Sequence, residues 1–80
     1  MKSITVKDLK DNLGRWIIIK EKDYPENVLI GKLSSAREFE FQHTSGVYAT
    51  IGGTEFEFSY SEDWAELFVT ASNILDLDTL

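Results

Sequence analysis

Four glutamates in two identical repeats are the residues of this chain whose type and spacing suggest chemistry. The repeats are Glu38-Phe39-Glu40-Phe41 and Glu55-Phe56-Glu57-Phe58, with thirteen residues between them. In an extended strand, alternate side chains lie on one face about 6.5–7 Å apart. That spacing is too wide for a compact metal site unless a loop brings the carboxylates together. The glutamates therefore indicate electrostatic recognition, and we expect no bound metal.

Other chemistry has little support in the sequence. The chain has one histidine, His43, and no cysteine, so a nucleophilic pair would have to form between His43 and a serine such as Ser45. A single histidine beside a turn is usually only a polar turn residue. Gly52-Gly53 lacks the lysine and the strand-to-helix setting of a phosphate loop. We therefore expect no enzymatic activity and no cofactor.

The charge of the chain is divided unevenly along its length. Residues 1–37 hold all eight Lys and Arg residues and five acidic residues, a net charge of +3. Residues 38–80 hold nine acidic residues and no Lys or Arg, a net charge of −9, which gives the −6 of the whole chain. Such a distribution bears on partners and association rates and not on the fold.

Hydrophobic periodicity predicts one helix followed by strands. Thr5 as N-cap, Asp8 in the first turn, a Val6/Leu9/Leu13 stripe and Gly14 predict a helix over 5–14. Alternating or β-branched runs then predict strands. These cover 15–22, 28–33, 37–43, 47–51 and 54–60, with turns at 23–27, at Thr44-Ser45-Gly46 and at Gly52-Gly53.

The end of the chain is open to two interpretations. Ser61 with Glu62 and Asp63 could cap a helix, or a loop could lead into the strand 66–70, because the apolar residues fit either period. The run Phe68-Val69-Thr70 favours the strand. A turn at Ser72-Asn73 and a last strand over 74–80 would then follow.

These elements predict a single domain over 1–80 of the mainly β (α+β) class. A short N-terminal helix would precede a strongly bent antiparallel meander, as in an SH3-like or Sm-like small barrel or a curled sheet. The longest apolar run, 16–19, is too short to span a bilayer, and the chain has no cysteine. We therefore expect a cytoplasmic protein that does not bind membranes.

The meander would place the four glutamates together. Alternation predicts that the phenylalanines of both repeats and Tyr60 enter the core, while Glu38, Glu40, Glu55 and Glu57 point outward beside Tyr48. The two repeats would be second neighbours about 10 Å apart. One interpretation is that these glutamates only keep the sheet soluble. Against it, a solvated sheet face normally mixes charges of both signs.

Two functional hypotheses follow. In the first, the chain is an acidic protein-binding module, similar in size and acidity to immunity proteins and phage anti-defence inhibitors, that occupies the basic nucleic-acid-binding surface of a partner. In the second, it is a self-assembling structural or accessory subunit, a homo-oligomer in which the basic segment of one copy meets the acidic segment of another. The predicted protein-binding residues are Glu38, Glu40, Tyr48, Glu55, Glu57, Tyr60, Glu62, Asp63, Trp64 and Glu66.

Direct nucleic-acid binding is disfavoured, because a net charge of −6 repels phosphate and the basic residues are interleaved with acids. Trp16 and Trp64 each fit a partly buried core position better than a recognition role.

Overall fold

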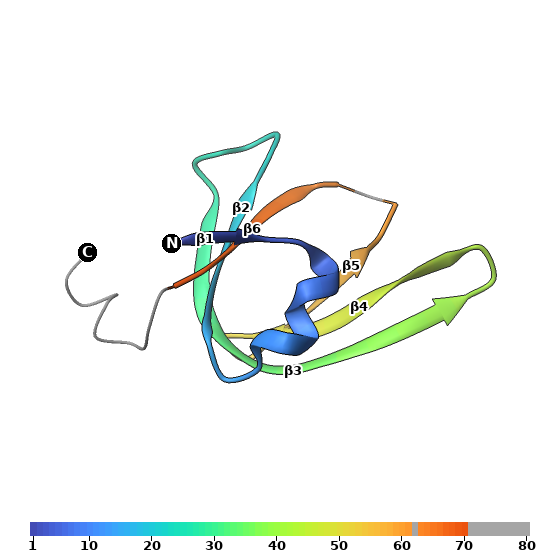
Figure 1. Cartoon of the computed structure of the whole chain (residues 1–80). Helices are drawn as coiled ribbons and strands as arrows, with labels where there is room; N and C mark the ends of the chain where they lie inside the picture. The colour runs from blue at the N-terminus through green and yellow to red at the C-terminus, as the bar shows by residue number, and fades with distance from the viewer. Residues whose placement is uncertain (62, 71–80) are drawn as a thin grey trace.

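Six strands form one antiparallel sheet in the computed structural model, which describes residues 1–61 and 63–70 (Figure 1). Their spatial order is β1-β6-β2-β3-β4-β5, and the sheet curls without closing into a barrel. The expected mainly β class with a curled sheet is confirmed. The strands are β1 (Lys2–Ile4), β2 (Trp16–Glu21), β3 (Val28–Phe41), β4 (Thr44–Ile51), β5 (Thr54–Ser59) and β6 (Ala65–Val69).

The meander from β2 to β5 follows the sequence prediction with two differences. The predicted strands 28–33 and 37–43 are one 14-residue strand, β3. The turn after it is made by Gln42 and His43, and Thr44–Gly46 already belongs to β4. Gln42 adopts φ 54°, which is uncommon for a residue other than glycine, so composition did not indicate the turn there. Gly52 and Gly53 form the predicted tight hairpin with φ 62° and 83°.

A β-bulge divides β3 into two parts. Leu33 pairs with Ile51 and Ser35 pairs with Thr50, so Ser34 is an extra residue in the ladder. The hydroxyl of Ser35 bonds the Thr50 hydroxyl at 2.9 Å. Before the bulge, the odd-numbered side chains of β3 face the core. Because the bulge adds one residue, the odd-numbered side chains after it face outward.

Strand β6 joins the two ends of the described chain. It pairs with β1 on one side, Ile4 opposite Leu67, and with β2 on the other, Ile19 opposite Leu67. The predicted strand at 66–70 is thus confirmed over Ala65–Val69, whereas β1 was not foreseen. The predicted turn at Ser72-Asn73 and strand at 74–80 lie outside the described residues.

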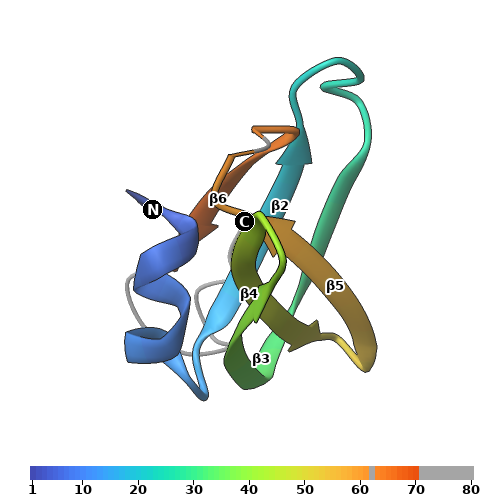
Figure 2. The ribbon, with the colours of Figure 1, turned by 90° about the vertical axis from the view of Figure 1, so that its right-hand side faces the viewer.

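The predicted helix is present as a 3₁₀ helix, η1 (Val6–Asn12), which lies against β3 and β4 on the inner face of the curl (Figure 2). The Asp8 carboxylate accepts hydrogen bonds from the Thr5 backbone N–H at 2.9 Å and from the Thr5 hydroxyl at 3.0 Å. Leu9 is fully buried, but Leu13 is 53% exposed, because the helix ends before it. The predicted three-residue stripe was therefore wrong at Leu13.

The core fills the inner side of the curl. The buried hydrophobic cluster consists of Ile4, Leu9, Ile17, Ile19, Leu33, Val47, Ala49, Ile51, Phe58, Leu67 and Val69. Phe56 and Trp64 pack against this cluster, and both tryptophans are half-buried. The predicted core positions were correct at Phe56 and Phe58. They were wrong at Phe41, which is 70% exposed, and at Tyr60, which is 37% exposed.

Candidate protein-binding site

The four glutamates are all exposed, but they do not share a face. Register places Glu57 beside Tyr48 and Arg37 on the outer face of the sheet. It places Glu38 beside Val47 and Phe58, on the inner face. The prediction of one four-glutamate surface is therefore wrong. The bulge at Ser34 is the cause, because it reverses the alternation of β3 relative to β5.

Glu38 of the first repeat contacts η1. Lys10 Nζ donates to Glu38 Oε1 at 2.7 Å, and this hydrogen bond, with the charge of Lys10, holds the pKa of Glu38 below its usual range. The same contact raises the pKa of Lys10. Lys7 Nζ lies 5.4 Å from the centre of the Tyr60 ring, a cation–π contact. Glu40 lies opposite Ser45 and has no ion pair among the described residues.

The outer face around Tyr48 is aromatic and carries one cation. Phe39 contacts Tyr48 with ring centres 4.5 Å apart, and the Arg37 guanidinium carbon lies 5.2 Å from the centre of the Tyr48 ring. Arg37 also pairs with Glu55 at 3.6 Å between Nη2 and Oε2. Phe39, predicted to be in the core, is thus half-buried on the opposite side of the sheet.

Ion pairs reduce the charge division seen in the sequence. The three salt bridges of the described chain are Lys10–Glu38, Lys22–Asp63 and Arg37–Glu55. Each joins a basic residue of 1–37 to an acidic residue of 38–80. The fold therefore relieves part of the repulsion within the acidic segment.

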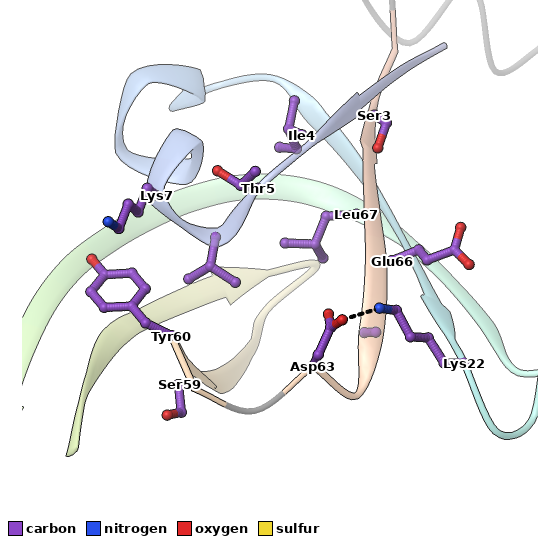
Figure 3. A pocket seen from close by; sticks show the side chains of 12 residues that line it. Ser3, Ile4, Thr5, Lys7, Lys22, Ser59, Tyr60, Asp63, Glu66 and Leu67 are labelled. Carbon is purple, nitrogen blue, oxygen red and sulfur yellow. Dashed lines mark hydrogen bonds and ion pairs between the residues drawn. The ribbon is translucent and has the colours of Figure 1, made fainter. Parts of the chain in front are cut away.

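Three predicted residues line an open pocket of about 510 Å³ near the start of β6 (Figure 3). Tyr60 and Lys7 lie on one side of it, and Asp63 pairs with Lys22 on the other, with Leu67 between them. Glu66 is also in its lining, whereas the predicted residue Glu62 lies outside the described residues. Cations and carboxylates are both present here, so this pocket has no clear preference for ligand charge.

A second pocket of about 380 Å³ has a different character. Five apolar residues contribute to its lining, Ile19, Val28, Leu29, Phe56 and Trp64. Trp64 stacks on Phe58 with ring centres 5.4 Å apart. The remaining lining residues are Glu21, Glu26 and Asn27.

Charge around this second pocket is negative. Asn27 Nδ2 donates to Glu21 Oε2 at 3.0 Å, which fixes one carboxylate, and no Lys or Arg is in the lining. An apolar hollow with carboxylates beside it suits an apolar side chain accompanied by a cation.

Sequence reasoning found only Trp64 of this second pocket. Leu29 is 53% exposed and Val28 is 47% exposed, and neither was expected to contribute to binding. The signal was present in the run Val28-Leu29-Ile30, because three consecutive apolar residues in a strand cannot all face one core. Ile30 is 49% exposed on the opposite face.

Residues with catalytic potential are not gathered in the described structure. His43 is exposed in the β3–β4 turn, and no hydrogen bond joins its side chain to Ser45 within the described chain. Residues 1–61 and 63–70 contain no group of three His, Cys, Asp or Glu side chains that could hold a metal ion. No helix in the same ranges is long and apolar enough to cross a membrane.

Comparison of the chain with known protein families, with curated proteins and with solved structures found no match.

Proposed function

We propose that this chain is a non-enzymatic protein-binding module that recognises a basic partner through the pocket of Leu29, Phe56 and Trp64. The observation that carries the proposal is that apolar residues, among them the exposed Leu29, surround one hollow together with Glu21 and Glu26. Aromatic and aliphatic anchors supply most of the affinity in protein interfaces, whereas charges at the rim supply steering and specificity.

The net charge of −6 supports a partner whose surface is basic. A basic surface that normally holds nucleic acid is the type of target that such a module would occupy, and binding would then inhibit by competition. The acidic residues beside the pocket, together with Glu57 on the outer face of β5, would attract that surface at long range and speed the encounter.

The experiment compares two leucines with equal exposure. Leu29 and Leu13 are each 53% exposed, but only Leu29 lines the pocket. Tagged wild-type protein, Leu29→Ser and Leu13→Ser are used as baits in lysate of the source cells, with nuclease present during capture. We expect a basic protein to be retained by the wild type and by Leu13→Ser, and to be lost from Leu29→Ser.

The purified complex is then challenged with nucleic acid. Displacement of the module by the nucleic acid would support competition for one surface. Equal retention by Leu29→Ser and Leu13→Ser, or a partner without a basic surface, would contradict the proposed function.

Self-assembly is a second candidate, because the described sheet ends in two strands of different charge. The β1 edge carries Lys2, and the β5 edge carries Glu55 and Glu57. Light scattering at low salt over a range of protein concentrations tests this. A molar mass that stays at one chain would exclude it.

A further inference from the structure

Strand β5 forms one edge of the sheet and is paired only on its β4 side in the described structure. The Tyr60 N–H donates to the Ser45 carbonyl at 2.9 Å, and Tyr60 follows the hairpin closed by Ile51 and Thr54. In an antiparallel ladder, hydrogen-bonded pairs alternate with pairs whose backbone groups point away. Residues 54, 56, 58 and 60 therefore bond to β4, and the N–H and C=O groups of Glu55, Glu57 and Ser59 point to the free edge.

Side-chain charge at this edge determines which strand it can accept. Glu55 and Glu57 project on the outer face, and Glu57 has no ion pair among the described residues. Antiparallel pairing of β5 with β5 of a second copy would bring the carboxylates of the two copies opposite each other. Like charges in directly opposed positions destabilise a sheet. The edge therefore disfavours a second β5 and favours a strand with cations at alternate positions.

The inner face of the same strand adds a second requirement. Phe56 lies between the two glutamates in sequence, points to the inner face and lines the pocket with Leu29 and Trp64. A strand added beside β5 would place every second side chain on this face. An apolar side chain at that position would lie beside Phe56 and the hollow.

We propose that β5 accepts an extended segment of the partner as an additional strand, with basic residues opposite Glu55 and Glu57 and an apolar residue between them. This inference rests on the proposed function, of which it specifies the binding mode and the sequence of the recognised segment. The six residues of β5 span about 20 Å, so the recognised segment is about six residues long. Backbone hydrogen bonds supply affinity, and the alternation of basic and apolar residues supplies specificity.

Three synthetic peptides test the binding mode on the full chain. The first contains Lys-Val-Lys-Val-Lys-Val between Gly-Ser ends. The second has the same composition with the lysines and valines in separate blocks. The third repeats the first with methyl groups on the backbone nitrogens of alternate residues, which removes half of the N–H donors and keeps the side chains. It is made in two versions, one methylated at the odd-numbered residues and the other at the even-numbered residues.

We expect the first peptide to slow hydrogen exchange of the Glu55, Glu57 and Ser59 amides about tenfold at saturation, because these N–H groups become bonded. We expect the block peptide, and one of the two methylated versions, to bind at least about tenfold more weakly than the first peptide, because they lose backbone pairing. Equal affinity for all the peptides, or no protection at these three amides, would overturn the strand addition.

Two charge reversals separate the edge from general electrostatic attraction. Glu57→Lys and Glu40→Lys change the net charge equally, and both side chains are exposed and without an ion pair in the described chain. We expect Glu57→Lys alone to weaken binding of the alternating peptide, by about fivefold or more. Equal effects of the two variants would mean that attraction acts without the edge, and would refute the proposal.

The captured partner distinguishes this inference from the proposed function. If the partner binds and depends on Leu29 while exchange at Glu55, Glu57 and Ser59 stays unchanged, the strand addition fails and the proposed function stands. If these amides are protected by the partner but Leu29→Ser binds it normally, the edge is the site and the proposed pocket is wrong.

Discussion

The contact between Lys10 and Glu38 gives Glu38 a different role from the partner binding that the sequence predicted. Glu38 belongs to an acidic repeat, yet its nearest charged partner is a lysine of η1 only 2.7 Å away. The ion pair connects the helix to β3 across the inner face. Its contribution is conformational, and it makes Glu38 a poor choice for a partner-binding residue.

The lowered pKa of Glu38 predicts an acid-dependent contribution to stability. A carboxyl whose pKa is lower in the folded chain stabilises the fold at neutral pH, and this contribution is lost as the pH falls through the folded pKa. In Glu38→Gln we expect a smaller loss of melting temperature between pH 7 and pH 3 than in the wild type. Glu66→Gln, at a residue without an ion pair among those described, serves as the control. An unchanged pH dependence in Glu38→Gln would show that the ion pair contributes no stability.

At the scale of elements, the bulge in β3 gives the two identical repeats different environments. Phe41 and Phe58 each end a repeat, but Phe41 is 70% exposed and Phe58 is 2% exposed. We expect Phe58→Ala to reduce the free energy of unfolding by about 3–5 kcal/mol, through lost burial and a cavity. Phe41→Ala should change it by no more than about 0.5 kcal/mol.

Urea unfolding of both variants measures the difference. Phe58→Leu provides a milder substitution if the alanine variant does not fold. Similar losses at Phe41 and Phe58 would mean that both repeats face the core, as strict alternation had predicted.

The bulge also shows which features of the fold local sequence patterns could predict and which they could not. Alternation and turn residues predicted the meander, the Gly52-Gly53 hairpin, the N-terminal helix and the strand of β6 correctly. They did not indicate a bulge at Ser34, because the prediction ended one strand at Leu33 and began the next at Arg37, and no local pattern marks the extra residue. That one-residue shift moved Glu38 and Glu40 away from Tyr48, and it divided the predicted binding surface.

Long-range contacts account for the other omissions. β1 has only three residues and is a strand because it pairs with β6, more than sixty positions later. The pocket of Leu29, Phe56 and Trp64 combines segments that are far apart in the chain, so no local pattern could indicate it. Local sequence thus predicted most of the elements and only one residue of the pocket.

At the scale of the whole molecule, the sheet is an open curl, and its β5 edge pairs with no further strand among the described residues. Its charge is more evenly distributed than the sequence suggested, since each of the three salt bridges connects the basic segment to the acidic one. The surface best suited to a partner therefore combines the edge of β5 with the neighbouring apolar pocket, and is not a uniformly acidic face.

The position of β6 between β1 and β2 also has a consequence for the order in which the chain folds. Strands β2 to β5 are neighbours in sequence and can pair through short loops, whereas β6 must be inserted between two strands made much earlier. Closing the long loop between β2 and β6 costs conformational entropy, and this cost is smaller once the paired strands β3 to β5 already hold the intervening chain. We therefore infer that the meander forms first and that insertion of β6 comes after the rate-limiting step.

Kinetics of a core variant in β6 test this order. Leu67 is 3% exposed and lies opposite both Ile4 and Ile19. If β6 inserts late, Leu67→Ala should accelerate unfolding and leave the folding rate nearly unchanged. Val47→Ala in the meander is the comparison, and it should slow folding. If Leu67→Ala folds slowly instead, β6 would already be paired with β1 and β2 in the rate-limiting step, and the inferred order would be wrong.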